Sequence, residues 1–330
     1  FREALELLAD RAGVELSRGK NGAQDNSLLA LLADATLFFH LNLKKSPEVM
    51  SYVLSRGITE ETIDTQKIGY ALSDWRTLYT FLKTKEYSDT DIEKAGLTIV
   101  SAKGYYDRFR GRVMFPIRTP SGKVVGFTGR VTPKTEAEST TQLGKYVNTP
   151  ETELYHKSKI LFNYDIAKNA IVEKDFCIVV EGQMDAILAS QLDTKNTVAV
   201  SGTAFTDEQL GLIMRMTRNI VLAFDSDKAG KSAMLKCAEL ALLSDANVEA
   251  VYIENGLDPA DCIQKNPATW LESVKNRKHV VLHLIDDIRR DIDDDRNFSL
   301  EVRRVVVPLV SRIKSHIDRE YFIKEIAKTL

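Results

Sequence analysis

The stretches VVEGQMD (179–185) and LAFDSDKAG (222–230) each place carboxylates directly after a short apolar run. Glu181 follows FCIVV and Asp225 follows NIVLAF, so each acid stands where a buried strand should end. In open α/β sheets, ligands bind outside the carboxyl ends of the strands. Asp227 comes two residues after Asp225, and in an extended segment two such side chains point the same way.

The rest of the chain predicts the fold around these acids. From about residue 160, apolar strands alternate with helical segments, a rhythm that predicts a mostly parallel, helix-covered sheet. Residues 1–100 predict helices with a polar linker at 17–27, and 112–131 predicts a β-hairpin around the turn TPSG. We expect a surface loop at 132–144. The expected class is α/β (α+β overall), with a mixed α/β subdomain (1–160), a metal-binding α/β domain (161–269) and a helical subdomain (270–330).

Composition narrows the class of protein. With 330 residues, 44% of them hydrophobic, the chain can bury cores for two or three domains. We expect no membrane segment, because no apolar stretch approaches the length that crosses a bilayer, and we expect the cytoplasm. Cys177, Cys237 and Cys262 are widely separated and form no C-x-x-C motif, so the sequence favours buried thiols over disulfides or a zinc site.

Charge is distributed unevenly. The net charge is −2, yet residues 101–170 contain 12 Lys and Arg against 6 Asp and Glu. This basic segment is compatible with a polyanionic partner, which the overall charge alone would disfavour.

A divalent cation is the natural counter-charge for the acids. A third acidic turn, with Asp258 and Asp261, follows the strand-like segment VEAVYI, and three acidic turns at one sheet edge would repel one another. Oxygen ligands of this kind suit Mg²⁺. Any one of these acids, taken alone, is more simply explained as a helix cap. Together, two acid-rich turns with Gly182 and Gly230 favour a metal site.

The pattern of a Glu after one strand and Asp-x-Asp after a later one resembles the TOPRIM domain of primases, topoisomerases and some nucleases. The resemblance extends to DnaG-type bacterial primases along nearly the whole chain. The segments that carry it are KIGYALSDWRTLYTFL (67–82), RFRGRVMFPI (108–117), GFTGRV (126–131), KYVNTPET (145–152), HKSKILFNYDIAK (156–168), VVEGQMDAI (179–187), SGTAFTDEQ (201–209), AFDSDKAGKSA (223–233) and GLDPAD (256–261).

The resemblance implies a DNA-directed RNA polymerase that makes short RNA primers on single-stranded DNA by metal-dependent nucleotidyl transfer. It implies that Asp225, Asp227 and Asp258 hold Mg²⁺, with Mn²⁺ as a substitute. Glu181 is then an acid/base or a further ligand, and Asp185 supports the cluster. The catalytic set is Glu181, Asp185, Asp225 and Asp227, and no zinc is expected in this chain.

The same resemblance assigns the basic segment to template and ribonucleoside triphosphates. If Arg108, Arg110 and Arg112 alternate in a strand, they share one face. The expected binding residues are Arg108, Arg110, Arg112, Arg130, Lys145, Tyr146, Asn148 and Lys157. Members of the family also have an N-terminal zinc ribbon and a C-terminal domain that binds the replicative helicase, so we interpret this chain as an excised catalytic core. A monomer is the simplest expectation.

Two departures from the family pattern stand out. Gln183 replaces an aromatic residue, and Ala260 replaces an acid, with Asp261 displaced by one position. A TOPRIM nuclease remains the alternative, because the acids alone do not distinguish the two. A topoisomerase would also need a nucleophilic tyrosine that nothing here marks, and a non-catalytic scaffold should lack the acids. A P-loop enzyme is disfavoured, because AGKS (229–232) lacks the upstream glycine.

Overall fold

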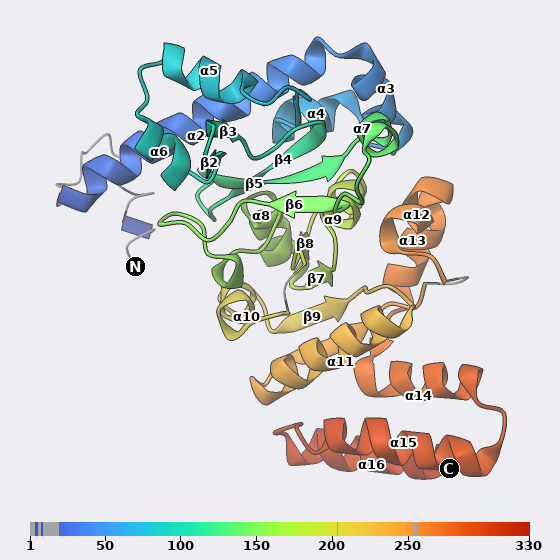
Figure 1. Ribbon diagram of the computed structural model, residues 1–330. Helices are drawn as coiled ribbons and strands as arrows, with labels where there is room; N and C mark the ends of the chain where they lie inside the picture. Colours follow the sequence, from blue (N-terminus) through green and yellow to red (C-terminus); the bar gives the residue numbers. More distant parts are fainter. Residues whose placement is uncertain (1–3, 6–7, 9–19, 203, 254–255) are drawn as a thin grey trace. The chain divides into compact units, whose positions relative to one another are not determined.

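A computed structural model describes residues 4–5, 8, 20–202, 204–253 and 256–330 (Figure 1). The chain divides into two compact units, Phe1–Lys157 and Ser158–Leu330. The helix expected at 1–16 lies largely outside the described residues. Each unit builds its own sheet and its own hydrophobic core.

The first unit is built on a four-stranded antiparallel sheet. Its order is β1-β4-β5-β6, and β2 pairs with β3 in a separate two-stranded sheet. The strands are β1 (Gly69–Ala71), β2 (Thr98–Ser101), β3 (Gly104–Asp107), β4 (Arg112–Arg118), β5 (Val124–Val131) and β6 (Tyr146–Asn148). The expected hairpin is confirmed by the β4–β5 pair, whose turn contains Gly122 at φ +88°.

Six helices of this unit lie in its described part. They are α2 (Lys20–Lys44), α3 (Pro47–Ser55), α4 (Glu60–Gln66), α5 (Thr77–Thr84), α6 (Asp89–Lys94) and α7 (Pro133–Glu138). The polar segment expected as a linker at 17–27 is helical from Lys20 onwards. A helix nucleated by packing extends at one hydrogen bond per added residue, so polar residues ahead of the buried stripe can join it.

Helix α2 is the core helix of the first unit. Leu28, Leu31 and Phe39 are buried in the same cluster as Phe127 of β5. The approach to β1 is so close that a Cβ on Gly69 would lie 2.5 Å from the Phe39 backbone. Residues Gln24–Lys44 are apolar enough, at mean hydropathy 1.2, to span a membrane by length and composition, contrary to our expectation. Part of that hydropathy comes from Leu28, Leu31 and Phe39, which are buried in the core of the first unit.

The segment 132–144 was expected to be a loop, but it begins with helix α7. Thr132 accepts a hydrogen bond from the N–H of Thr135, and Pro133 occupies the first helical turn. Both features start helices, so the sequence did carry the signal.

The second unit contains the mostly parallel sheet that the βαβα rhythm predicts. Its order is β11-β10-β9-β7-β8, with β10, β9, β7 and β8 parallel and β11 antiparallel at the edge. The strands are β7 (Cys177–Val180), β8 (Thr197–Ala199), β9 (Asn219–Leu222), β10 (Asn247–Ala250) and β11 (Lys278–His279). The three cysteines are free and buried, as expected.

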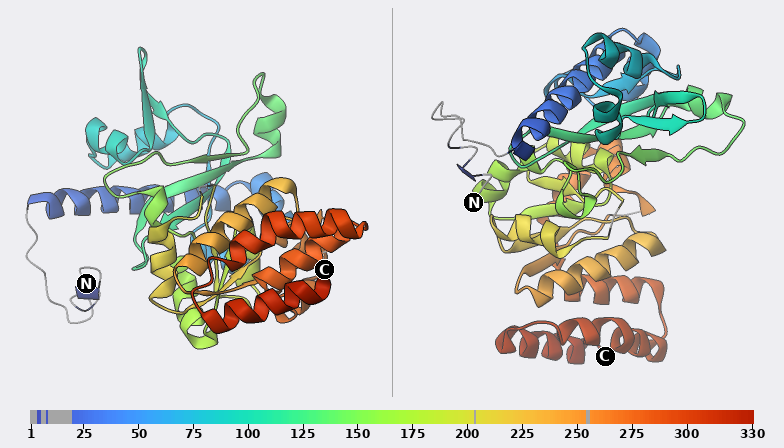
Figure 2. Two further views of the ribbon diagram at one scale, coloured as in Figure 1. Left: turned by 90° about the horizontal axis from the view of Figure 1, so that it is seen from below. Right: turned by 60° about the vertical axis from the view of Figure 1, so that its left-hand side comes forward.

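Helices cover this sheet and continue beyond it. They are α8 (Tyr164–Lys174), α9 (Gln183–Ser190), α10 (Asp207–Met214), α11 (Lys228–Leu243), α12 (Pro259–Lys265), α13 (Pro267–Lys275), α14 (Val280–Asp291), α15 (Asp295–Val310) and α16 (His316–Thr329), with a short 3-10 helix at Lys157–Lys159. Figure 1 and Figure 2 show α14 next to α11, with α15 and α16 together on the far side of α14.

Residues 270–330, which we expected to form a separate helical subdomain, share the core of the sheet. Val280, Val281 and Leu284 of α14 belong to the same buried cluster as Val248 of β10. The reason is that α14 begins directly after the edge strand β11, which pairs with β10 and so holds the helix against the sheet.

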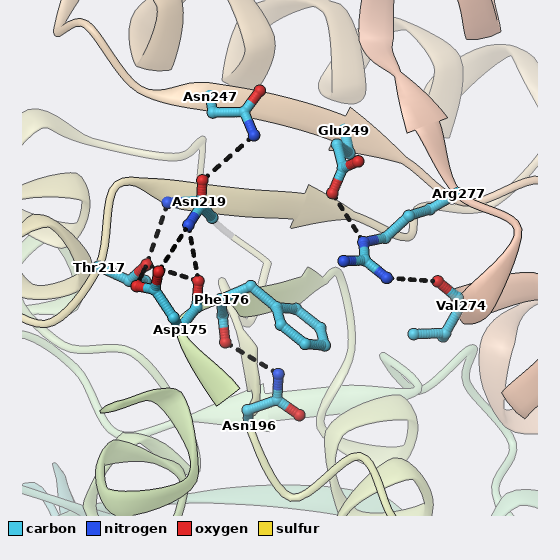
Figure 3. A network of polar contacts seen from close by, with 9 residues as sticks. All are labelled: Asp175, Phe176, Asn196, Thr217, Asn219, Asn247, Glu249, Val274 and Arg277. Atoms are coloured by element: carbon cyan, nitrogen blue, oxygen red, sulfur yellow. Dashed lines mark hydrogen bonds and ion pairs between the residues drawn. The ribbon is translucent and has the colours of Figure 1, made fainter. Parts of the chain in front are cut away.

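A polar network fixes the amino-terminal edge of the sheet (Figure 3). The Asp175 carboxylate, just before β7, accepts hydrogen bonds from Thr217 Oγ1 at 2.8 Å and Asn219 Nδ2 at 3.2 Å. Asn247 Nδ2 of β10 donates to Asn219 Oδ1 of β9 at 3.1 Å. These bonds align the starts of three strands and thereby the turns at their opposite ends.

Candidate active site

Glu181 and Asp225 leave the sheet at the same edge, as the sequence predicts. Strands β7 and β9 are parallel neighbours, with Val179 paired to Leu222, and Glu181 follows β7 directly. The Asp225 N–H donates to Glu181 Oε1 at 3.4 Å. The turns after two adjacent strands therefore meet, and both carry carboxylates.

Gly230 allows this close approach. A Cβ at this position would lie 2.2 Å from the Asp225 carbonyl oxygen and 2.8 Å from Glu181 Oε1. No side chain fits there without moving the Asp225 turn. Gly230 lies within the first turn of α11, where the backbone is helical and any residue can adopt it. Glycine is therefore needed here for lack of space and not for its backbone freedom.

Asp227 and Asp258 both act as helix caps. Asp227 Oδ1 accepts the N–H of Gly230 at 2.7 Å at the start of α11, and Asp258 Oδ1 accepts the N–H of Asp261 at 2.6 Å at the start of α12. Both acids are therefore helix caps, which is the simpler explanation that the sequence offers for each of them. Capping does not remove their charge, and it holds each carboxylate in a fixed position at its turn.

Asp185 is buried beneath the turns, with 6% of its surface exposed. Its two carboxyl oxygens accept the N–H groups of Gly182 and Ala260, each at 3.0 Å. Burial, followed by the charges of Asp258 and Asp225, raises the pKa of Asp185 to about 8. The residue thus ties the start of α9 to the start of α12, and Ala260, where the family pattern has an acid, contributes its backbone to this tie.

The acids match the chemistry of a divalent cation. Burial raises the pKa of Glu181, the Asp225 N–H opposes that effect, and the Asp227 charge adds to it. Such mutual repulsion is what a cation bound by oxygen ligands would relieve. Within the described residues, however, no three His, Cys, Asp or Glu side chains stand close enough together to hold a metal ion.

The basic residues of the first unit are placed differently from our expectation. Arg108 and Arg110 lie between β3 and β4, and only Arg112 is in a strand, so the three do not share one strand face. Gly111, at φ +60°, turns the chain between Arg110 and Arg112 and breaks the alternation.

Arg112 is a buried residue of the first unit. Only 6% of it is exposed, and its guanidinium donates to the carbonyl oxygens of Gly129 and Gly144, each at 3.0 Å. Those bonds hold the segment before β6 against β5. The geometry gives Arg112 a positioning role near Lys145 rather than a contact with a ligand.

Arg130 and Tyr146 face each other across β5 and β6. The Arg130 guanidinium donates to the Tyr146 hydroxyl at 3.0 Å and also bonds the Tyr52 side chain. Lys145 is exposed, while Asn148 has a buried amide oxygen without a hydrogen-bond partner in the described part of the chain. Lys157 lies in the short 3-10 helix. A cation, an aromatic ring and an unpaired amide oxygen are thus gathered around β6.

This unit also carries an aromatic cluster that we did not expect from the sequence. Trp75 is 63% exposed, the Arg110 guanidinium lies 4.3 Å from its ring centroid, and Tyr106 packs edge-on at 5.3 Å. Exposed aromatic rings with a stacked arginine are typical of surfaces that bind single-stranded nucleic acid. A tryptophan in the polar segment SDWR (73–76) was the available signal.

The chain is similar to DNA primases in sequence. Residues 38–168 match the family model of the DNA primase catalytic core, N-terminal domain, and residues 178–263 match a Toprim-like model. The DNA primase of Clostridium acetobutylicum is 30% identical over 99% of this chain and 55% of its own length. The chain thus spans about half the length of the curated relatives it matches.

Solved structures give the same relationship. The RNA polymerase domain of Mycobacterium tuberculosis primase DnaG superposes with a TM-score of 0.81 at 30% identity, covering 92% of this chain and 98% of that domain. A DnaG primase catalytic domain bound to single-stranded DNA superposes with a TM-score of 0.77 at 26% identity, covering 94% and 97%.

Proposed function

The chain belongs to the family of DnaG primase RNA polymerase domains, and from this we propose that it synthesises RNA primers on single-stranded DNA. The observation that carries the proposal is the meeting of the Glu181 and Asp225 turns at the carboxyl edge of adjacent parallel strands. Carboxylates fixed there suit nucleotidyl transfer, which needs alignment and charge neutralisation more than covalent chemistry.

We propose that Glu181, Asp225, Asp227 and Asp258 hold Mg²⁺, for which Mn²⁺ can substitute. A cation held there would neutralise the charge that develops on the transferred phosphoryl group. The capping bonds of Asp227 and Asp258 and the two backbone bonds of Asp185 keep the turns in place. Glu181, whose pKa is raised, either adds a ligand or takes up the proton of the attacking hydroxyl.

Template and triphosphates are assigned to the first unit. Arg108, Arg110, Arg130, Lys145, Tyr146, Asn148 and Lys157 are the proposed contacts, with Arg112 holding the segment that carries Lys145. The related catalytic domain bound to single-stranded DNA supports a strand as partner. We add Trp75 and Tyr106 as stacking surfaces for bases, because aromatic stacking is tolerant of sequence.

We also propose that the protein works as a monomer in the bacterial cytoplasm. Because the chain spans about half the length of its curated relatives, we further propose that contact with the replicative helicase is made by a C-terminal domain of the longer protein. A Toprim nuclease shares the acids, but the primase RNA polymerase domain that covers 92% of this chain gives the nuclease no added support.

Incorporation of labelled ribonucleotides on a single-stranded template, with Mg²⁺ or Mn²⁺, tests the proposal. We expect RNA product from the unaltered chain and none from Asp225→Asn. Template cleavage by the unaltered chain without RNA product would overturn primer synthesis in favour of the nuclease.

A further inference from the structure

The second unit contains a charge network that the proposed function does not use. Its centre is Asp287 of α14, whose side chain is only 16% exposed. The Asp287 carboxylate pairs with Lys231 Nζ at 2.8 Å and with the Arg290 guanidinium at 3.3 Å. An exposed ion pair contributes little, but a carboxylate that is largely out of water and has two cationic partners is held firmly. Asp287 therefore fixes both cations in position.

Lys231 connects this network to the Asp225 turn. It follows Gly230 in the first turn of α11, and its N–H donates to the Asp227 carbonyl oxygen at 2.9 Å. Its Nζ also pairs with Asp291 at 2.8 Å, so two carboxylates of α14 hold this side chain. The start of α11 is thereby tied to the end of α14, and the two helices lie side by side (Figure 2).

Arg290 connects the network to the chain segment ahead of Asp258. Its guanidinium lies 3.8 Å from the ring centroid of Tyr252, just after β10. A cation over an aromatic face is attracted by the ring, more strongly where water is excluded. Further along the chain, Asp258 caps α12. Asp287 thus stands between the start of α11 and the segment that leads to the third acidic turn.

The relative position of these turns decides whether their acids can share a cation. Among the residues that the structure describes, no three His, Cys, Asp or Glu side chains already stand close enough together to do so. We propose that Asp287 is a positioning residue, which places the turns of Asp225 and Asp258 and thereby sets their affinity for a divalent cation. This inference rests on the metal site of the proposed function. It gives α14 a role beyond its packing on the sheet.

Titration calorimetry of the 330-residue chain with Mn²⁺, without nucleotide or template, tests the positioning role. Asp287→Asn keeps the size of the side chain and removes its charge, and Lys231→Met removes the partner's charge. We expect each variant to weaken Mn²⁺ binding about three- to tenfold, within the range that one residue of a coupling network contributes. Lys231→Arg keeps the charge and should retain most of the affinity. Since Asp287→Asn and Lys231→Met remove the same contact, the double variant should lose less than the product of the single losses.

Arg312 provides the matched control. Its guanidinium, just after α15, pairs with Glu239 of α11 at 2.8 Å. Arg312→Met therefore removes an ion pair from the same helix, about two turns beyond Lys231, and should leave Mn²⁺ binding unchanged. Ribonucleotide incorporation at increasing Mg²⁺ gives a second readout. We expect Asp287→Asn to need more Mg²⁺ for its half-maximal rate and to reach the normal rate at saturating Mg²⁺.

The outcomes separate the positioning role from the metal site itself. If Asp225→Asn weakened Mn²⁺ binding and Asp287→Asn did not, the positioning role alone would be overturned. Equal losses of affinity in Asp287→Asn and Arg312→Met would also overturn it, because they would show a general loosening of α11. If even Asp225→Asn bound Mn²⁺ as the unaltered chain does, the metal site would be wrong and the positioning role would fall with it.

Discussion

At the residue scale, the acids at the strand ends combine helix capping with a proposed metal site, and the two roles can be separated. Asparagine caps helices as well as aspartate does, but it lacks the charge. We expect Asp227→Asn to lose RNA synthesis while keeping its stability, and Asp227→Ala to lose RNA synthesis and about 0.5–2 kcal/mol of unfolding free energy. Urea denaturation and ribonucleotide incorporation measure the two effects.

Asp294 provides the matched control for Asp227. It caps α15 in the same way, accepting the Asn297 N–H at 2.8 Å. Asp294→Ala should therefore lose a similar amount of stability and retain RNA synthesis. Incorporation at the normal rate by Asp227→Asn would remove Asp227 from the proposed ligand set.

Asp107 gives a pH-dependent prediction in the first unit. Its buried carboxylate accepts the N–H groups of Leu78 and Tyr79 at the start of α5, and burial raises its pKa to about 6. The unfolded value is about 3.9. Between these values the folded chain holds a proton that the unfolded chain has lost, so this residue's contribution to stability falls as the pH rises from about 4 to 6.

The measurement is the difference in unfolding free energy between Asp107→Asn and the unaltered chain across this pH range. We expect the variant to gain relative stability as the pH rises, by about 3 kcal/mol at most, because one pKa unit corresponds to about 1.4 kcal/mol. Asp89→Asn, at the exposed start of α6, should show no such upward trend, since its pKa is lowered by Lys83 and Tyr79. A flat difference for Asp107→Asn would contradict the raised pKa.

At the scale of elements, the start of α11 brings the two acidic turns together, and Gly230 is the point of closest contact. We expect Gly230→Ala to displace the Asp225 turn and reduce RNA synthesis strongly, because the new Cβ would overlap the Asp225 carbonyl oxygen. Ribonucleotide incorporation by the folded variant measures the loss.

Gly211 in α10 is the matched control for Gly230. A Cβ there meets nothing within 4 Å, so Gly211→Ala should retain RNA synthesis and gain up to about 1 kcal/mol from helix propensity. A fully active Gly230→Ala variant would show that the turn is free to move without consequence.

The ends of the strands could be predicted from the sequence. A short apolar run marks a buried strand, and the residue that follows the run must lie at the carboxyl end of that strand. Glu181 and Asp225 were placed in this way. Gly111 shows the limit of such reasoning, because its left-handed backbone breaks the alternation of Arg108, Arg110 and Arg112. The burial of Arg112 and the bond from Ala260 to Asp185 depend on segments far apart in the sequence, so no local pattern predicts them.

At the scale of the whole molecule, the sequence predicted three domains, whereas the described residues form two units. The two units meet between Lys157 and Ser158. The segment 270–330 was ambiguous because a helix with one apolar face shows the same periodicity whether it packs on its own bundle or on a sheet. The pairing of β11 with β10 places α14 on the core of the sheet. Because β11 has only two residues, it has no alternating pattern by which the sequence could have predicted it.

This arrangement predicts how the second unit responds to truncation. Residues 158–330 produced alone should unfold cooperatively, whereas 158–269 should not fold, because it lacks Val280, Val281 and Leu284 of α14 and Phe298 of α15. Each buried side chain of this size contributes about 2–5 kcal/mol, and a domain's net stability is only about 5–15 kcal/mol. Thermal melts followed by circular dichroism make the comparison.

A shorter truncation serves as the control for this loss. Residues 158–314 lack only α16, which contributes Phe322 and Ile326 to the same core, so this fragment should still melt cooperatively but at a lower temperature. If 158–269 melted as sharply as 158–330, the helices after 270 would be dispensable to the sheet. The core shared by α14 and β10 would then contribute little to the free energy of unfolding, and the separate helical subdomain that the sequence suggests would be the better description.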